Sequence, residues 1–256
     1  MVLKVSIFLD TPELCGHRGS GRGVVRGHRE STLESYRAAV EAGLRWVEVD
    51  ARVNADDLLV ASHEPVAANG DGRLISTLET EETDRVGLMR IADLLESLPE
   101  HAGIDIEVKT SLEDALRPRQ ETTAALVADV AARALERRPI LVSSFDPAAL
   151  TIVRERAEDV PLGLLTWGGF PLRKAIPAAV HLGAKVVAPN TASFRLDGAT
   201  TAPLEREPSE FVRVAHDAGL QVLVWCPGPE EGRQLIDAGV DCLVIDDVPE
   251  TVARYR

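Results

Sequence analysis

The sequence has no long apolar run and few aromatic residues. None of its apolar stretches is long enough to cross a bilayer. The opening decapeptide MVLKVSIFLD lacks the length and the small-residue cleavage site of a secretory leader. We therefore expect a cytoplasmic protein without a stable membrane anchor, and the pattern does not predict an oligomeric state. Apolar residues nevertheless make up 45% of the 256 residues, enough to build a full core.

Excess positive charge is also lacking, since the net charge is −13. Such a chain repels nucleic acid and anionic membranes, so neither is an expected partner. The charge is compatible with recruitment of a divalent cation, but an anionic small-molecule substrate would need local positive charge. Four arginines near the N-terminus supply some: Arg18, Arg22, Arg26 and Arg29. The chain has only four lysines but 24 arginines. An arginine is therefore weak evidence for an anion-binding site, and Lys109 is stronger evidence.

Cysteine is scarce, with Cys15, Cys226 and Cys242 only. Each lies in a run that is typical of a strand, and there is no Cys-x-x-Cys motif to indicate a metal site. We expect buried, reduced thiols.

Short β-rich runs alternate with helical segments along the whole chain. The expected strands span residues 13–17, 46–53, 103–109, 139–145, 161–167, 185–190, 221–226 and 241–247. Eight strand–helix units in this length predict a (β/α)₈ TIM barrel, a single α/β domain over residues 1–256. An open doubly wound sheet is the alternative, but the glycines after the first strand do not form a clear G-x-G-x-x-G turn.

Two local features refine this prediction. Ser31 followed by Glu34 has the spacing of a capping box, and the helix that it would open ends at Ala42-Gly43. An insertion after strand two, roughly residues 54–90, would lie on the face of the barrel that carries active sites.

Charged side chains stand where barrel strands should be apolar. Glu48 and Asp50 share one face of the second strand, and Glu107 and Lys109 share one face of the third. Converging carboxylates are costly to bury unless cations or a metal compensate them. Three oxygen ligands suit Mg²⁺ or Ca²⁺. The alternative is a pair of interior salt bridges, Glu48 with Arg52 and Glu107 with Lys109.

Two histidines lie beside these carboxylates in the expected fold. His17 ends the first strand, and a short strand in "LLVASH" would return His63 toward the same pocket. Two histidines flanking a metal can divide acid and base roles. His101, His181 and His216 lie in helical or loop contexts, and we expect them to be structural.

In order and spacing, these residues resemble the glycerophosphodiester phosphodiesterase family over essentially the whole chain. The matching segments are "HRG" at 17–19, "EST" at 30–32, "EVD" at 48–50, "HE" at 63–64 and "EVK" at 107–109. The segments "SSFDPAAL" at 143–150 and "GVDCLVIDD" at 239–247 are also similar. The family consists of metal-dependent (β/α)₈ barrels that hydrolyse glycerophosphodiesters to an alcohol and glycerol 3-phosphate.

The resemblance implies a role for each matching residue. His17 and His63 would be the catalytic acid/base pair, and Arg18 and Lys109 would contact the phosphate. Trp225 would form an aromatic wall for the glycerol or alcohol. The implied ligands of one Mg²⁺ or Ca²⁺ ion are Glu48, Asp50 and Glu107, with Glu30 as a direct ligand or an outer partner.

The chain departs from the family pattern in four places. The segment between "HRG" and "EST" is longer than usual, and Ser31 replaces an asparagine. Glu64 replaces an aspartate, and "IDDVPE" differs from the usual Thr-Asp-x-Pro. His28 lies in the longer segment, where we expect a loop. These departures leave the natural head group open.

Three alternatives to this function remain. The first is a lysophospholipase D-like activity on lyso-lipids. The second is a Mg²⁺-dependent enolising enzyme, which usually needs a basic residue on a later strand, where this chain has Asn190, Trp225 and Asp246. The third is a non-catalytic barrel that only binds ligands. The sequence also does not decide whether water or the glycerol 2-hydroxyl is the nucleophile.

Overall fold

A closed barrel of parallel strands forms the centre of the protein. The structure is a computed structural model that describes residues 6–68, 72–194 and 207–255. Within these residues eight parallel strands form the barrel: β1 (Glu13–Gly16), β4 (Trp46–Val53), β6 (Gly103–Val108), β7 (Ile140–Ser144), β8 (Leu162–Thr166), β9 (Val186–Pro189), β10 (Gln221–Trp225) and β11 (Cys242–Ile245). Pairing of β1 with both β11 and β4 closes it. The predicted single-domain (β/α)₈ barrel is confirmed, and its expected strands match to within two residues at either end.

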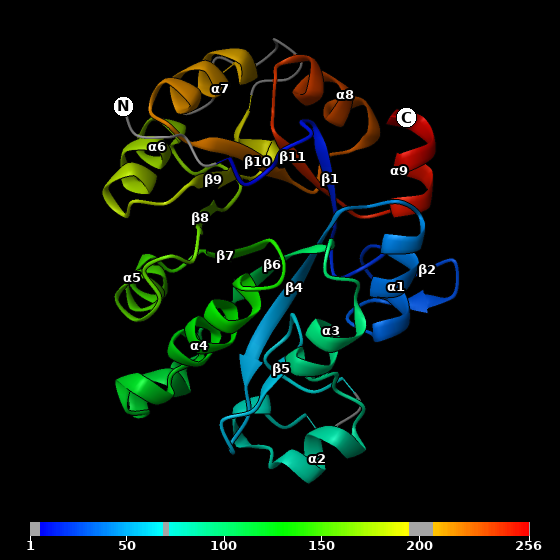
Figure 1. Ribbon diagram of the computed structural model, residues 1–256, viewed down its shortest axis with the longest axis vertical. Coiled ribbons are helices and arrows are strands. Elements are labelled where there is room, and N and C mark those ends of the chain that lie inside the picture. Colours follow the sequence, from blue (N-terminus) through cyan, green and yellow to red (C-terminus); the bar gives the residue numbers. More distant parts are fainter. Residues whose placement is uncertain (1–5, 69–71, 195–206, 256) are drawn as a thin grey trace.

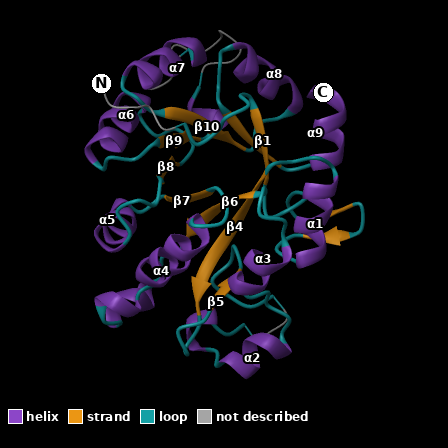
Figure 2. Cartoon of the chain, viewed as in Figure 1, coloured by secondary structure: helices purple, strands orange, loops and turns teal. Residues whose placement is uncertain are grey.

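Helices surround the barrel as an outer ring (Figures 1 and 2). They are α1 (Leu33–Glu41), α3 (Ile91–Ser97), α4 (Thr123–Leu135), α5 (Pro147–Arg156), α6 (Leu172–His181), α7 (Pro208–Asp217), α8 (Pro229–Asp237) and α9 (Val248–Tyr255). None of the helices in the described segments is long and apolar enough to span a membrane.

The alternation of side chains along β4 explains how the barrel is filled. Val47 and Val49 belong to the core between strands and helices. Trp46 faces the other way and packs edge-on against Phe8, with the ring centroids 5.2 Å apart, in a second apolar cluster inside the barrel. Glu48 and Asp50 follow Trp46 on that inner face. The interior is therefore apolar where the strands begin and acidic where they end.

The insertion after β4 folds back beside the barrel. It contains β5 (Leu59–Ala61), which pairs antiparallel with β4, then the 3₁₀ turn η1 (Ile75–Thr77) and helix α2 (Thr80–Arg85). A separate small core of Val60, Ala67, Ile75 and Leu78 holds it together. In Figure 1 α2 and β5 project from the barrel next to β4, with α3 beside them. Strand β5 delivers the segment that carries His63, as the sequence predicted.

The connection from β1 to α1 differs from the prediction. It contains a hairpin of two very short strands, β2 (Val24–Val25) and β3 (His28–Arg29), which are too short to give a sequence pattern. The predicted Ser31–Glu34 capping box is wrong. Ser31 has φ +57° and donates its N–H to the carbonyl of Arg18, so it belongs to the loop. Thr32 caps the helix instead, accepting from the Ser35 N–H. The predicted end is confirmed, with Ala42 as the C-cap and Gly43 at φ +94°.

Candidate active site

Three carboxylates meet inside the barrel at the carboxyl ends of two neighbouring strands. Glu48 and Asp50 lie on β4, and the parallel register places Asp50 directly beside Glu107 of β6. One oxygen from each side chain lies within 4.8 Å of the others, and all three residues are buried. The i, i+2 spacing therefore brings the predicted side chains together as expected.

Two cations partly neutralise these carboxylates. The Nζ atom of Lys109 lies 3.0 Å from Oδ1 of Asp50 and also contacts Oε1 of Glu107. The Nε atom of Arg18 lies 3.2 Å from Oδ2 of Asp50. The Glu107–Lys109 salt bridge considered from the sequence is thus present. Arg52 has different partners, because its guanidinium donates to the backbone carbonyls of Ser62 and His63.

The electrostatics of this cluster favour an additional positive charge. Burial raises the pKa of Glu48 well above its usual range, and repulsion from Asp50 and Glu107 raises it further. Burial likewise raises the pKa of Glu107 to about 7, against the opposing attraction of Lys109. Among the described residues, Oε1 of Glu48 is buried without a hydrogen-bond partner. When ionised, the three carboxylates outnumber the two cations Lys109 and Arg18, and their close oxygen donors fit a hard divalent cation such as Mg²⁺ or Ca²⁺.

Arg18 connects the cluster to the first loop. Its backbone N–H donates to Oε2 of Glu48 over 3.0 Å. Its Nη1 lies 3.2 Å from Oε1 of Glu30, whose carboxylate also accepts the Gly23 N–H. Glu30 therefore lies on the Arg18 side and is not one of the three carboxylates that meet within 4.8 Å.

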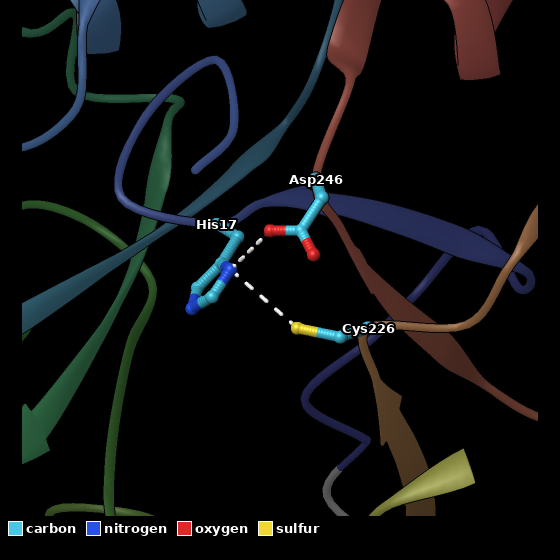
Figure 3. Close-up of side chains that lie close together, drawn as sticks. All are labelled: His17, Cys226 and Asp246. Atoms are coloured by element: carbon cyan, nitrogen blue, oxygen red, sulfur yellow. Dashed lines mark hydrogen bonds and ion pairs between the residues drawn. The ribbon is translucent and has the colours of Figure 1, made fainter. Parts of the chain in front are cut away.

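His17 follows directly after β1 and faces the same end of the barrel. Its Nδ1 lies 2.6 Å from Oδ1 of Asp246, and its Nε2 lies 3.9 Å from Oε2 of Glu48. The Sγ atom of Cys226 lies 3.5 Å from Nδ1 (Figure 3). The expectation for this cysteine is wrong in two respects, because Cys226 lies just beyond β10 and is only partly buried. Its contact with His17 arises from tertiary packing. Cys15 and Cys242 are buried free thiols, as predicted.

His63 stands on the insertion, two residues beyond β5. Its Nδ1 lies 2.8 Å from Oε1 of Glu64. Partial burial lowers the pKa of His63, although the hydrogen bond to Glu64 opposes this effect. His63 lines a cavity of about 320 Å³ together with Glu30 and Arg29, and the apolar part of the wall includes Val66, Leu88 and Met89.

Trp225 ends β10 beside another aromatic residue. Its ring packs edge-on against Phe145, with the centroids 5.6 Å apart, and its Nε1 donates to the Thr166 carbonyl. The Nζ atom of Lys109 lies 5.7 Å from the Phe145 ring centroid. An aromatic surface thus adjoins the charged cluster.

The remaining histidines lie in the contexts that we expected for structural residues. His181 ends α6, His101 lies in a turn, and Nε2 of His216 in α7 contacts Asp241 at 2.8 Å. The loop expected around His28 is wrong, because His28 lies in the short strand β3, opposite Val25.

Two acidic residues of this site were given no role from the sequence, since Asp105 was overlooked and Asp246 was noted only as a residue at a later strand end. Asp105 precedes Glu107 by two residues on the same face of β6, and burial raises the pKa of Asp105 to about 7. The i, i+2 rule that identified Glu48 and Asp50 would have found it. Asp246 contacts His17 across 229 residues of sequence. The predicted closure of the barrel places the last strand beside the first, and this could have indicated the contact between Asp246 and His17.

The fold and the site together define a (β/α)₈ barrel protein with an acidic, histidine-flanked centre at the carboxyl ends of its strands. A sequence model of the glycerophosphoryl diester phosphodiesterase family matches residues 17–250, and the chain belongs to this family.

Individual relatives agree with this assignment. The glycerophosphodiester phosphodiesterase of Caldanaerobacter subterraneus is 26% identical over 255 residues, covering 92% of this chain and 94% of the relative. The glycerophosphocholine phosphodiesterase of Rattus norvegicus is 25% identical over 91% of this chain, which spans only 43% of that protein's length. An Oleispira antarctica phosphodiesterase, solved with the product sn-glycerol-3-phosphate, has the same fold at TM-score 0.73, with 21% identity, covering 95% of this chain and 96% of the other.

Proposed function

We propose that this protein hydrolyses glycerophosphodiesters to an alcohol and glycerol 3-phosphate. The observation that carries the proposal is the convergence of three buried carboxylates within 4.8 Å of one another, with Lys109 and Arg18 on Asp50 and His17 beside Glu48. Family membership supplies the reaction class. A cytoplasmic location stays a prediction of the sequence.

Glu48, Asp50 and Glu107 would hold one divalent cation. Such an ion supplies Lewis-acid polarisation of a phosphoryl oxygen and lowers the pKa of an attacking hydroxyl group. The donor set suits both Mg²⁺ and Ca²⁺. Glu30 would act through Arg18, because its carboxylate bonds that guanidinium at 3.2 Å.

Arg18 and Lys109 would bind the phosphoryl group. Both cations already lie among the carboxylates. Burial alone would lower the pKa of each cation, but the neighbouring carboxylates raise it overall, so both stay protonated. Placed against the phosphoryl oxygens, they would stabilise the charge that develops there in the transition state. Trp225 and Phe145 would offer an apolar wall to the carbon skeleton of the substrate.

His17 and His63 would divide the proton transfers. One imidazole accepts the proton of the attacking oxygen, and the other donates a proton to the leaving alcohol. His63 is suited to accept, since burial lowers its pKa and favours the neutral ring. The cavity beside His63, with its mixed polar and apolar wall, would receive part of the substrate.

A lysophospholipase D-like activity is the second candidate. The observation in its favour is the exposure of three large apolar side chains in the connections after β6 and β8. Leu112 and Leu116 begin and end the 3₁₀ helix η2 (Leu112–Leu116), and Trp167 follows β8 directly. These connections follow the carboxyl ends of the strands, where a lipid chain leaving the site would pass.

The direct test compares two substrates and three histidine variants. We expect glycerol 3-phosphate release from glycerophosphocholine with Mg²⁺ or Ca²⁺, and its loss with a chelator. His17→Ala and His63→Ala should lower kcat by about 10²- to 10⁴-fold, the usual contribution of a general acid or base. His28→Ala is the matched control and should retain activity. Faster turnover of lysophosphatidylcholine would favour the second candidate, and activity unchanged in both His17→Ala and His63→Ala would refute the mechanism.

A further inference from the structure

His17 belongs to a hydrogen-bonded group of three side chains. His17, Cys226 and Asp246 come from the ends of β1, β10 and β11 and point toward one another (Figure 3). We propose that Asp246 is a positioning residue that holds His17 in one tautomer, with the proton on Nδ1 and a free lone pair on Nε2. The kinetic consequence rests on the proposed function, whereas the tautomer itself does not.

The geometry assigns the two ring nitrogens to different tasks. Nδ1 lies 2.6 Å from Oδ1 of Asp246, which is hydrogen-bond distance. Nε2 lies on the other side of the ring, 3.9 Å from Oε2 of Glu48 and thus toward the carboxylate cluster. An ionised carboxylate can only accept, so the proton of a neutral ring belongs on Nδ1.

The groups around Asp246 keep its carboxylate ionised. Burial alone would raise its pKa, but hydrogen bonds and attraction from His17, together with Arg22 and the Cys226 thiol, lower it overall. The carboxylate thus remains an acceptor at neutral pH, so whenever the ring is neutral its proton is on Nδ1 and its lone pair is on Nε2.

A metal ion shared by the three residues fits less well. Nitrogen and oxygen ligands of a tetrahedral zinc ion, each bonded at about 2.0–2.2 Å, lie roughly 3.3 Å apart. The nitrogen and oxygen here are only 2.6 Å apart. Burial and the adjacent Asp246 also raise the pKa of the Cys226 thiol, which opposes the thiolate that a metal needs. The contacts are those of a hydrogen-bond network.

The surrounding backbone holds Asp246 and Cys226 in place. Cys226 has φ +54°, a left-handed conformation that is costly for a residue with a Cβ, and it places Sγ 3.5 Å from Nδ1. The carbonyl of Asp246 packs so closely on Gly21 that an added Cβ there would overlap it. The loop after β1 therefore packs against the end of β11 and holds Asp246 in place. Such packing around a neighbouring residue fixes the orientation of a catalytic side chain.

The experiment reads the tautomer directly, by ¹⁵N NMR of histidine-labelled protein, with the His17 signals assigned by comparison with His17→Gln. In the wild type, at a pH where the ring is neutral, we expect Nδ1 to be protonated and Nε2 to be unprotonated. A neutral wild-type His17 ring that carries its proton on Nε2 would overturn the proposal, whatever the behaviour of the Asp246 variant. In Asp246→Ala we expect the two tautomers to mix. The control is Asp247→Asn, which removes the same charge one residue away, at a carboxylate that accepts from the Glu250 N–H, and it should leave the His17 signals unchanged.

Steady-state kinetics then measure how much this tautomer contributes to kcat. Asp246→Ala should lower kcat about 10- to 100-fold, part of the roughly 10²- to 10⁴-fold contribution of acid/base catalysis, with KM little changed. Asp247→Asn should retain kcat. Wild-type kcat or unchanged His17 signals in Asp246→Ala would overturn the proposal. The predicted tautomer combined with full activity of His17→Ala would instead refute the catalytic role of His17.

Discussion

The backbone amide of Arg18 donates a hydrogen bond to Oε2 of Glu48 over 3.0 Å. Arg18 has φ +50°, and this conformation turns its amide toward Glu48 while its guanidinium lies against Asp50 and Glu30. One residue thus orients the first loop relative to the carboxylate cluster and presents a cation there. Its main chain and its side chain have separable tasks.

Arg18→Lys tests the side chain alone, because the amide of any residue can make the bond to Glu48. Lysine lacks the planar fork that binds a phosphoryl group through two parallel hydrogen bonds. A lost hydrogen bond to a charged group is worth about 1.5–3 kcal/mol, or roughly 10- to 100-fold in kcat/KM. Steady-state kinetics should show this loss with a thermal unfolding midpoint close to that of the wild type. Wild-type kcat/KM would contradict a role in phosphate binding.

Lys109→Met should make stability depend strongly on the metal ion. The Nζ atom lies 3.0 Å from Oδ1 of Asp50 in a largely buried setting, and its removal leaves Arg18 as the one remaining cation of the two described beside the carboxylates. Breaking a buried ion pair in this way costs about 3–5 kcal/mol. Urea unfolding with a chelator should show that loss, and Mg²⁺ should restore more stability to the variant than to the wild type. Lys174→Met, at an exposed lysine on α6, is the control and should change little. Equal stability of Lys109→Met and wild type without metal would contradict the account.

Glu64→Gln should lower the pKa of His63 further. Burial already lowers this pKa, and the hydrogen bond from His63 to Glu64 is the main opposing effect. The protonated imidazole loses an anionic partner in the variant, so the proton leaves at a lower pH. NMR titration of His63 gives the pKa directly. If His63 must be neutral to accept a proton, the acid limb of the activity profile should move to lower pH by the same amount. A pKa that rises in the variant would show that Glu64 does not stabilise the charged ring.

Gly21→Ala and Gly23→Ala form a matched pair in one loop. Both glycines have positive φ, +132° and +79°. An added Cβ at Gly21 would overlap the carbonyl of Asp246, whereas one at Gly23 meets nothing within 4 Å. Gly23→Ala should therefore cost only the backbone strain, about 1 kcal/mol, and Gly21→Ala clearly more. Gly21→Ala should also lower kcat, since the end of β11 must shift. Chemical denaturation and kinetics of both variants would show this difference, and equal losses would argue against the contact.

The sequence predicts the features that depend on local periodicity. The bounds of β4 were predicted as observed, because apolar and polar residues alternate from Val47 onward, and the same alternation places Glu48 and Asp50 on the inner face. The capping residue and the β2–β3 hairpin were not predicted, because Ser31 adopts a left-handed conformation that depends on Arg18 and because two-residue strands carry no period. The partners of His17 were also missed, since Asp246 and Cys226 reach it only once the barrel has closed.

We propose that Glu48, Asp50 and Glu107 tolerate one another because a divalent cation binds among them. A crystal structure of the protein soaked with Mn²⁺, with anomalous scattering to locate the ion, tests this most directly. We predict one strong anomalous peak in contact with oxygens of all three side chains, and its loss in Glu48→Gln. No peak among these carboxylates at saturating Mn²⁺, with Lys109 and Arg18 still filling the space between them, would contradict the account.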